Sequence, residues 1–265
     1  MKKAVFFDID GTLIDAPHGK PDISPASRTA IKKLQREGHY VFIASGRPFG
    51  FINSTIVDVG FDGFVQMNGA VVTVHDEIVY EKAIPFATVK ELRRIAAEAG
   101  ADYDLQTPNY IYIQPTFTRL INFYRSIHVP EAYWRHDFDP EEIREVYKME
   151  FTSQSDLFDQ SLFDQFISLP NMTGVSDPNH GANIEIYSKL ETKGSGIRHA
   201  LDYLGIPIEN SYAFSDGIND IEMMQTVGHS LVMGNAVKEL LPLAETVLPT
   251  VAEEGVAWGI EHCVL

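Results

Sequence analysis

The chain passes from a buried strand into a polar loop very early, in the stretch Ala4-Val5-Phe6-Phe7-Asp8-Ile9-Asp10-Gly11-Thr12. Four consecutive apolar residues are typical of a strand that is covered on both faces of a sheet. Two aspartates follow directly, and ligands of open α/β sheets bind outside the carboxyl ends of the strands. Asp-Gly is also a common turn pair, so a plain polar turn is the alternative. The stretch predicts a parallel sheet with a polar site at the end of its first strand.

The same alternation of apolar strands and helical segments recurs at both ends of the chain. Near the amino end we expect a helix between Ser24 and Gly38, a helical stretch from Pro48, strands at 40–44 and 64–67, and a hairpin at 71–80. Near the carboxyl end we expect a helix at 196–204, a strand at 212–214, a helix from 218, a strand at 231–233 and a helix from 237. Apolar strands that alternate with helices form parallel units with helices on both faces of the sheet.

The pattern changes between residues 83 and 187. This part predicts helices at 89–99, 141–145 and 157–166, and strands at 110–113, 148–152, 172–175 and 184–187. These elements do not continue the parallel rhythm, although the chain returns to that rhythm afterwards. The predicted fold class is therefore α/β, with a doubly wound, mostly parallel Rossmann-like core at 1–82 and 188–265 and an inserted α+β cap domain at 83–187.

Composition limits the possible partners. The chain has 265 residues, 21 Lys and Arg against 37 Asp and Glu, and a formal net charge of −16. It therefore lacks the basic balance that nucleic acids and anionic membranes require, and no obligate protein partner is evident. Cys263 is the only cysteine, so no intramolecular disulfide can form. No apolar run approaches the roughly 18 residues of a membrane span, and we expect a reducing, cytoplasmic setting.

A second polar cluster, Ser215-Asp216-Gly217-Ile218-Asn219-Asp220, also follows an apolar strand. Its side chains could simply cap the next helix. In a doubly wound sheet, however, the two clusters could lie side by side. Asp8, Asp10 and Asp216 would then form an all-oxygen pocket that suits Mg²⁺.

Two smaller features could bind an anion. Ser45, Gly46 and Arg47 follow the second predicted strand, where a hydroxyl and backbone amides near a helix start can hold a phosphate. Lys193 precedes a helical run and could add a compact positive charge. Taken alone, each is more often an ordinary turn or a solvated side chain.

In order and position these residues resemble the four motifs of the haloacid dehalogenase-like (HAD) hydrolases. The matching residues are Asp8-x-Asp10-x-Thr12, Ser45, Lys193 and Asp216-Gly217-x-Asn219-Asp220. The long insertion between the second and third motifs is similar to that of the Cof-type phosphatases, which carry an α+β cap there. Ser215 departs from the pattern, since the family usually has glycine at that position.

The resemblance implies a Mg²⁺-dependent phosphatase that hydrolyses small phosphomonoesters such as sugar phosphates through an aspartyl-phosphate. It implies that Asp8 is the nucleophile and Asp10 the general acid and base, and that Mg²⁺ is held by Asp8, the Asp10 carbonyl and Asp216. The residues it assigns to the phosphoryl group and its surroundings are the Ile9 and Gly46 amides, Thr12, Ser45, Lys193 and Asn219, with Asp220 behind the metal. The role of Arg47 stays open.

Two other functions share these motifs. A phosphomutase would pass the phosphoryl group to another sugar hydroxyl instead of water. A phospho-receiver would use the acidic pocket without turnover, but the acid/base Asp10 and a cap of this size are surplus to that role. In the cap, Tyr110, Tyr112, Tyr133 and Trp134 could stack on a substrate or simply pack, and His180 and Asn183 are possible substrate selectors.

Overall fold

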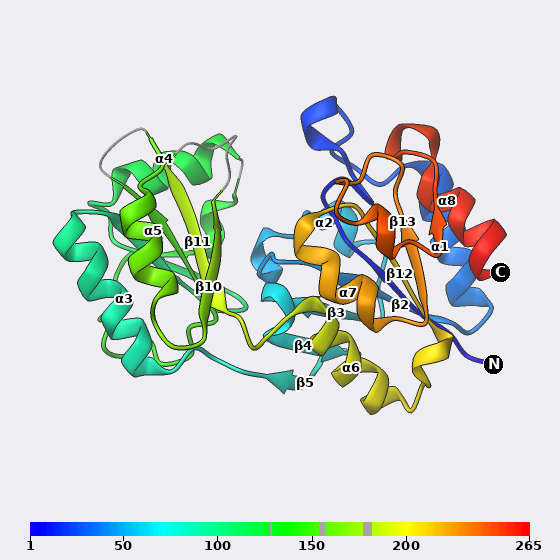
Figure 1. Ribbon diagram of the computed structural model, residues 1–265, viewed down its shortest axis with the longest axis horizontal. Coiled ribbons are helices and arrows are strands. Elements are labelled where there is room, and N and C mark those ends of the chain that lie inside the picture. Colours follow the sequence, from blue (N-terminus) through cyan, green and yellow to red (C-terminus); the bar gives the residue numbers. More distant parts are fainter. Residues whose placement is uncertain (128, 154–156, 177–181) are drawn as a thin grey trace. The chain divides into compact units, whose positions relative to one another are not determined.

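The computed structural model describes residues 1–127, 129–153, 157–176 and 182–265 (Figure 1). These residues form two compact units. The first contains Met1–Arg47, Ile52–Glu81 and Glu191–Leu265, and the second contains Pro48–Phe51 and Lys82–Leu190. The second unit thus includes a short segment from the amino-terminal part of the chain as well as the long insertion.

The first unit is built on an eight-stranded sheet of order β14-β13-β12-β1-β2-β3-β4-β5. Its strands are β1 (Ala4–Phe7), β2 (Tyr40–Ala44), β3 (Gly63–Gln66), β4 (Val71–Val74), β5 (Glu77–Glu81), β12 (Ser211–Ser215), β13 (His229–Val232) and β14 (Thr246–Val247). Neighbours from β14 to β3 are parallel, whereas β4 and β5 add an antiparallel hairpin. The predicted α/β fold with a parallel central sheet is confirmed.

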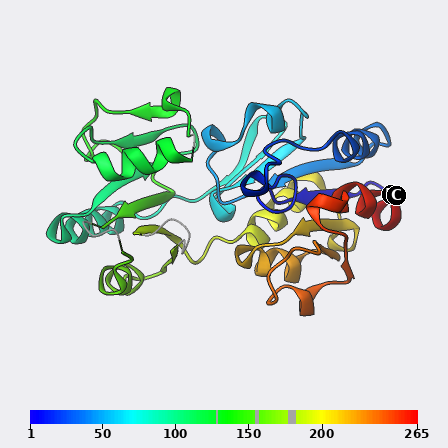
Figure 2. The ribbon, with the colours of Figure 1, turned by 90° about the horizontal axis from the view of Figure 1, so that it is seen from above.

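Helices cover both faces of this sheet. They are α1 (Pro25–Arg36), α2 (Ser54–Val57), α6 (Lys193–Leu204), α7 (Ile221–Thr226) and α8 (Gly255–Gly259). Shorter helical turns span Ala16–His18, Met67–Gly69, Ile208–Asn210, Ile218–Asp220, Leu241–Leu243, Val251–Glu253 and Ile260–Val264. Helices α6 and α7 lie on one side of the sheet, and α1 and α8 lie on the other (Figure 2). The central strands β1 and β2 are buried along almost their whole length, which explains their continuous apolar runs.

Three helices predicted near the two ends of the chain can be compared with the structure. Ser24 caps α1 as expected, because its hydroxyl accepts a hydrogen bond from the Ser27 amide at 3.1 Å. The helix expected from Val237 is wrong, since that stretch forms turns. A helix through Pro242 would lose that residue's backbone donor, and its ring would clash with the carbonyl of Lys238. The helical stretch expected from Pro48 is broken into a turn at Phe49–Phe51 and the short α2.

The second unit has a six-stranded sheet of order β10-β11-β9-β6-β7-β8. Its strands are β6 (Asp102–Gln106), β7 (Ile111–Ile113), β8 (Trp134–Arg135), β9 (Lys148–Thr152), β10 (Met172–Ser176) and β11 (Asn183–Ser188). Its helices are α3 (Phe86–Ala99), α4 (Thr118–Ser126) and α5 (Gln160–Ile167), with a helical turn at Glu131–Tyr133. Among the described strands of this unit, only β7 and β8 pair in parallel, so the unit is α+β.

The helix expected at 141–145 is wrong. Ile143 is the only apolar residue between Asp139 and Glu145, so a helix there would have no apolar stripe to bury. The stretch is held from outside instead, because Lys90 and Arg93 of α3 pair with Glu141 at 3.1 and 2.8 Å.

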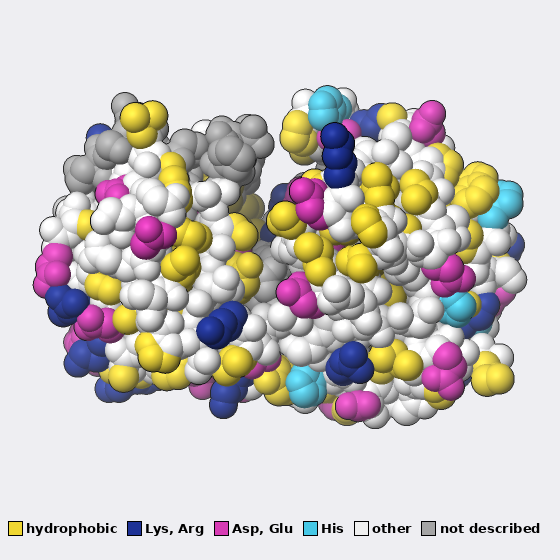
Figure 3. Space-filling model, in the orientation of Figure 1, with side chains coloured by type: hydrophobic (Ala, Val, Ile, Leu, Met, Phe, Trp, Pro, Cys, Tyr) yellow, Lys and Arg dark blue, Asp and Glu magenta, His cyan; other side chains and the backbone are white. Residues whose placement is uncertain are grey.

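The molecular surface carries charges of both signs. On the face drawn in Figure 3, acidic and basic side chains of the described residues are interspersed. Along the described ranges, every helix is too short or too polar to cross a membrane.

Candidate active site

The ends of three neighbouring strands bring the predicted polar residues together. Strand β1 lies between β12 and β2 and runs parallel to both, so their carboxyl ends share one edge of the sheet. Asp8 follows β1, Asp216 follows β12, and Ser45 follows β2. The Asp8 amide donates a hydrogen bond to the Phe214 carbonyl at 3.0 Å, which extends the pairing into the loop.

The turn after Asp10 is shaped to fit Asp216. The Thr12 hydroxyl donates to Asp216 Oδ1 at 2.8 Å. Gly11 has a φ of +83°, and a Cβ there would lie 1.9 Å from Asp216 Oδ2. A side chain at position 11 would therefore displace the carboxylate, in addition to the backbone strain. The sequence indicated that this position matters, since Gly11 lies between the motif residues Asp10 and Thr12.

Lys193 is the centre of the buried charges. It is the first residue of α6, whose start is fixed by Thr192, which accepts a hydrogen bond from the Ser195 amide at 3.1 Å. Its ammonium group lies 2.6 Å from Asp8 Oδ1 and 2.6 Å from Asp220 Oδ1. Burial alone would lower the pKa of Lys193, but the two carboxylates outweigh burial and raise it. The lysine therefore stays charged.

Asp220 holds Lys193 from behind. Its side chain is fully buried, and its second oxygen accepts a hydrogen bond from the Gly217 amide at 3.1 Å. The same carboxylate therefore fixes both the lysine and the loop that carries Asp216.

The acids of this site have excess negative charge. Burial raises the pKa of Asp8 well above its usual range, and the charges of Asp220 and Asp216 add to this increase, although Lys193 opposes it. Burial also raises the pKa of Asp216 to about 7. When ionised, Asp8, Asp216 and Asp220 carry three negative charges, of which Lys193 offsets one. One divalent cation would balance the remaining two. Carboxylate and carbonyl oxygens are the ligands that Mg²⁺ prefers, so this donor set fits it.

Metal binding here does not need a cluster of three acidic side chains. In the described part of the chain, no three His, Cys, Asp or Glu side chains converge as a metal site. The predicted ligand set consists of two carboxylates, from Asp8 and Asp216, and the carbonyl of Asp10.

The Asp10 side chain points to a different partner. Arg47 donates to both of its carboxylate oxygens, from Nε at 2.9 Å and from Nη2 at 2.8 Å. Such a two-point pair fixes both the charge and the orientation of the carboxylate. Asp10 is 55% exposed, unlike the buried Asp8. Sequence reasoning placed Arg47 beside the site but missed this pair, because nothing in the spacing of the two residues indicates it.

Ser45 and Gly46 lie against a strained turn. The Ser45 hydroxyl accepts from the Arg47 amide at 3.2 Å, and the Ser45 carbonyl accepts from the Asn68 amide at 3.2 Å. A Cβ on Gly46 would lie 2.9 Å from Asn68 Oδ1. Asn68 has a φ of +56°, a left-handed conformation that asparagine tolerates better than most residues. Sequence analysis did not identify this contact.

Asn235 ties two further loops to the site. Its Nδ2 donates to the Gly11 carbonyl at 2.8 Å, and its Oδ1 accepts from the Val251 amide at 3.0 Å. The Val237 amide donates to the Asp216 carbonyl at 2.9 Å. The chain after β13 thus supports both acidic loops, a role that the sequence pattern around Asn235 did not reveal.

The remaining residues that the sequence placed at the site make fewer contacts with its acidic side chains. The Ile9 side chain is fully buried, and its carbonyl accepts from the Leu13 amide at 2.9 Å. Asn219 is exposed on the loop after β12, and no hydrogen bond joins its side chain to the other described site residues. Ser215 is fully buried, and its hydroxyl has no partner among the described residues.

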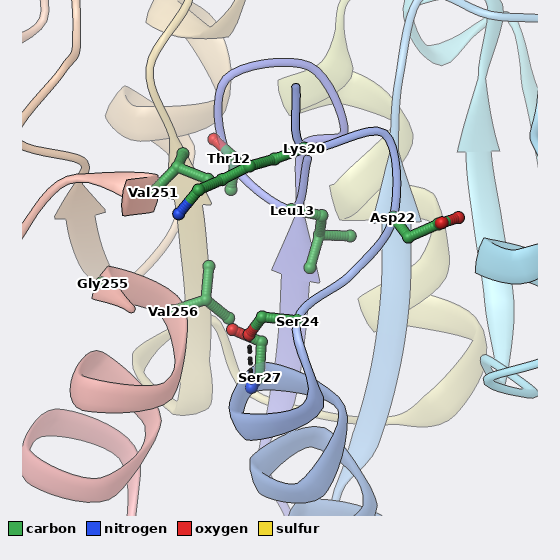
Figure 4. Close-up of a pocket in the computed structure, with 9 residues that line it drawn as sticks. All are labelled: Thr12, Leu13, Lys20, Asp22, Ser24, Ser27, Val251, Gly255 and Val256. Atoms are coloured by element: carbon green, nitrogen blue, oxygen red, sulfur yellow. Dashed lines mark hydrogen bonds between the residues drawn. The ribbon is translucent and has the colours of Figure 1, made fainter. Parts of the chain in front are cut away.

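A small cavity lies beneath Thr12 (Figure 4). It is bordered by Ser24, Ser27 and Val256, and its volume is about 20 Å³. That is room for a single water molecule. Lys20 reaches across its edge and donates to the Ala252 carbonyl at 3.2 Å. The cavity is too small for a substrate, so the polar edge of the sheet is the candidate site.

The aromatic residues considered for the cap contact other residues of the second unit. Trp134 is buried in an apolar cluster with Ile113 and Tyr124, and Tyr112 stacks edge-on against Phe138. Tyr110 lies 3.8 Å from the guanidinium of Arg135, and Tyr133 packs on Gly50. Asn183 accepts a hydrogen bond from the Thr152 hydroxyl, and His180 lies outside the described residues.

Comparison with known proteins shows the family of the chain. The family described as haloacid dehalogenase-like hydrolase matches residues 5–260. The chain belongs to this family. Among relatives, YkrA of Bacillus subtilis (strain 168) is 29% identical, covering 98% of this chain and 97% of YkrA. Phosphatase YwpJ of the same organism is 25% identical, covering 98% and 99%.

A solved structure extends the comparison to the fold. The sugar phosphatase BT4131, described as a member of HAD subclass IIB, is 26% identical and superposes with a TM-score of 0.81. The match covers 98% of both chains. With the family and the relatives named as phosphatases, it shows that this haloacid dehalogenase-like chain is an enzyme of the phosphatase class.

Proposed function

We propose that the protein hydrolyses small phosphomonoesters in two steps through an aspartyl-phosphate on Asp8, with Mg²⁺ as its cofactor. The observation that carries the proposal is the buried contact of Lys193 with Asp8 and Asp220, next to an Asp216 fixed by Thr12. A carboxylate that attacks a phosphate must overcome the repulsion of two negative charges. A buried cation beside that carboxylate reduces this repulsion.

Asp8 is the residue suited to attack phosphorus. Its Oδ1 is held by Lys193 at 2.6 Å, which orients the carboxylate and leaves Oδ2 for the bond to phosphorus. Mg²⁺, bound by Asp8, Asp216 and the Asp10 carbonyl, would supply the charge that makes the phosphate group electrophilic and keeps Asp8 ionised. Splitting the reaction into attack and hydrolysis replaces one difficult step with two easier ones.

Asp10 is suited to move protons. It would donate a proton to the oxygen of the leaving group and then accept one from the water that hydrolyses the intermediate. Its carboxylate is 55% exposed, so it can reach the leaving group of a substrate and the attacking water. Because Arg47 bonds both Asp10 oxygens, proton delivery requires that this pair open. Opening of this pair would also let the Arg47 guanidinium contact the substrate.

The other site residues would hold the phosphoryl oxygens. In the proposal, these donors are the Ile9 and Gly46 amides, the Ser45 hydroxyl, Asn219 and Lys193, with Thr12 shaping the loop and Asp220 holding the lysine. Small movements at this site would be costly, since a misplacement of about 1 Å can reduce turnover about 100-fold.

Substrate choice is assigned to the insertion. We place the chemistry on a catalytic core at 1–82 and 188–265 and the selection of the leaving group on a cap domain at 83–187. The substrate class we propose is a small phosphorylated metabolite, specifically a sugar phosphate, by likeness to BT4131.

A panel of phosphomonoesters, followed by release of inorganic phosphate, tests the function. We expect turnover with Mg²⁺, loss of turnover after EDTA dialysis, and recovery when Mg²⁺ is restored. Asp216→Asn should abolish turnover, whereas Asp22→Asn, a change of an exposed carboxylate in the same unit, should not. Turnover that survives EDTA would contradict the metal assignment. Conversion of a hexose 1-phosphate to the 6-phosphate, without free phosphate, would indicate a phosphomutase instead.

A further inference from the structure

The short segment Pro48–Phe51 belongs to the second unit by its contacts, although the chain on both sides of it belongs to the first unit. Arg47, which precedes the segment, and Ile52, which follows it, both lie in the first unit. We call Pro48–Phe51 the linking segment. It connects the two units directly after the predicted anion-binding residues, far in sequence from the long insertion.

Phe51 makes the main apolar contact of the linking segment. Its half-buried ring lies edge-on to the ring of Tyr124, with the two ring centres 5.6 Å apart. It also packs against the buried apolar cluster that β7 and α4 form in the second unit. Burial of an aromatic ring and edge-on contact with a second ring both stabilise the packed position. Phe51 therefore anchors the segment in the second unit.

Two further contacts hold the middle of the segment. The ring of Tyr133 covers Gly50 so closely that a Cβ at Gly50 would lie 2.7 Å from Tyr133 Cδ1. The Phe49 amide donates a hydrogen bond to the Pro108 carbonyl at 3.1 Å. Side-chain packing and a backbone hydrogen bond thus fix the same four residues, so the segment moves with the second unit.

Arg47 joins this segment to the general acid and base of the proposed reaction. Its Nε and Nη2 donate to the two carboxylate oxygens of Asp10 at 2.9 and 2.8 Å. The ring of Pro48 fixes its own φ and also limits the conformations of the residue before it. Because rotation at this junction is limited, a displacement of the segment shifts the Arg47 backbone.

Two compact units joined by linkers ordinarily move relative to each other. We propose that Phe51 is a positioning residue that makes Arg47 follow the second unit, so that movement of this unit releases Asp10 from Arg47. The inference rests on the proposed function, in which Asp10 transfers protons only after this pair opens. Without the anchor, the linking segment would yield to the movement and Arg47 would stay bonded to Asp10.

Amide hydrogen exchange tests the anchor without turnover. Phe51→Ala removes the anchoring ring, and Phe123→Ala is the matched control. Phe123 is also half-buried, its ring centre also lies 5.6 Å from that of Tyr124, and it packs against the same cluster, but it belongs to α4. By NMR, the Phe49 amide should exchange at least about tenfold faster in Phe51→Ala and within about threefold of the wild-type rate in Phe123→Ala.

Kinetics with p-nitrophenyl phosphate and Mg²⁺ test the release of Asp10. This probe has a good leaving group, so formation of the aspartyl-phosphate needs no proton from Asp10, whereas its hydrolysis still needs Asp10 as a base. Phe51→Ala should therefore lower kcat at least about tenfold and leave kcat/KM within about threefold of the wild-type value. Weaker substrate binding would lower kcat/KM instead. Phe123→Ala should change neither constant by more than about twofold.

A double-mutant cycle with Arg47→Ala shows whether Phe51 acts through Arg47. In the Arg47→Ala background there is no pair to open, so Phe51→Ala should change kcat by less than about twofold. Thermal unfolding checks the fold of each variant. If Phe51→Ala lacks a cooperative transition, Phe51→Leu replaces it, with Phe123→Leu as its control.

Three results would overturn the proposal: unchanged exchange of the Phe49 amide in Phe51→Ala, an unchanged or raised kcat in that variant, or an equal loss of kcat with and without Arg47. Failure of the proposed function would give a different result. In that case the wild type would release no phosphate from this probe or from any ester of the panel, and the role in catalysis would fall with it. The exchange measurement would then still decide whether Phe51 anchors the linking segment.

Discussion

Gly11 tests how closely the turn after β1 must fit Asp216. Gly11→Ala should reduce turnover at least about 100-fold, because its Cβ would occupy the space of Asp216 Oδ2. Gly19→Ala is the matched control, since Gly19 has a φ of +77° and open space around its missing Cβ. The control should lose about 1–2 kcal/mol of stability from strain alone and keep its activity. Equal loss of activity in both variants would mean that strain, not crowding of Asp216, is responsible.

Asp216 also predicts a dependence of stability on pH. Its pKa is about 7 in the folded protein against 3.8 ordinarily, so the folded state binds the proton more tightly. Without metal, the free energy of unfolding should therefore fall as pH rises from about 4 to about 7. Excess Mg²⁺ should remove most of this loss, because it binds the ionised, folded form.

Urea unfolding in EDTA and in Mg²⁺ across this pH range measures the effect. Asp216→Asn should reduce the slope seen in EDTA, since the titrating group is gone. Parallel curves in EDTA and Mg²⁺ would contradict the assignment of a cation to these carboxylates.

At the scale of single residues, the sequence predicted positions better than partners. Asp8, Asp216 and Ser45 could be placed together because each directly follows a strand, and parallel strands end at one edge. The Asp10–Arg47 pair and the support from Asn235 could not be predicted. Both depend on side-chain directions across loops, which spacing along the chain does not determine.

Helix α4 is joined to β6 by a buried polar contact. The Tyr124 hydroxyl donates to Asp104 Oδ2 at 2.5 Å, and Gln106 and the Glu150 amide also donate to that carboxylate. Burial raises the pKa of Asp104 to about 6, and these hydrogen bonds keep the increase from being larger. The carboxylate is therefore ionised at neutral pH only because its donors are present.

Tyr124→Phe should destabilise the protein by about 1–3 kcal/mol at pH 7, since a buried carboxylate loses a donor. The penalty should shrink as pH falls below about 6, where Asp104 becomes protonated and needs fewer donors. Tyr112→Phe is the control, because the Tyr112 hydroxyl has no hydrogen bond among the described residues. Urea unfolding at pH 7 and pH 5 measures both variants, and an equal penalty at the two pH values would argue against this explanation.

Several elements with apolar patterns were predicted well, although helix α4 was missed, and a strand with a buried polar face was also missed. Strand β9 and helix α3 were expected close to their observed bounds because their apolar residues alternate or recur at the helical period. Strand β6 was not expected, since Asp102, Asp104 and Gln106 are polar although all three are buried. Their partners come from α4 and β9, so only the tertiary structure explains their burial.

At the scale of the whole molecule, each of the two units has its own apolar core. One core lies between the eight-stranded sheet and α6, and another lies between α3, α5 and the six-stranded sheet. Deleting residues 83–187 and joining the ends should therefore leave a core that folds cooperatively, with altered substrate selectivity. Circular dichroism and urea unfolding test the fold, and a product without a cooperative transition would count against two independent domains.

The excess of acidic residues in the chain also affects how the candidate site binds a phosphate. Of the excess negative charge, part is concentrated at Asp8, Asp216 and Asp220, where Lys193 compensates only one charge. A phosphate should therefore bind well only when a divalent cation is present.

The most direct test of the account is to detect the covalent intermediate on Asp8. Asp10→Asn should slow hydrolysis of the intermediate more than its formation when the substrate has a good leaving group, so phosphoenzyme should accumulate after mixing with substrate and Mg²⁺. Acid quenching followed by peptide mass analysis should then find one added phosphoryl group on Asp8, and none in the Asp8→Asn, Asp10→Asn double variant. A phosphoryl group on another residue, or full phosphate release by Asp8→Asn alone, would contradict the mechanism.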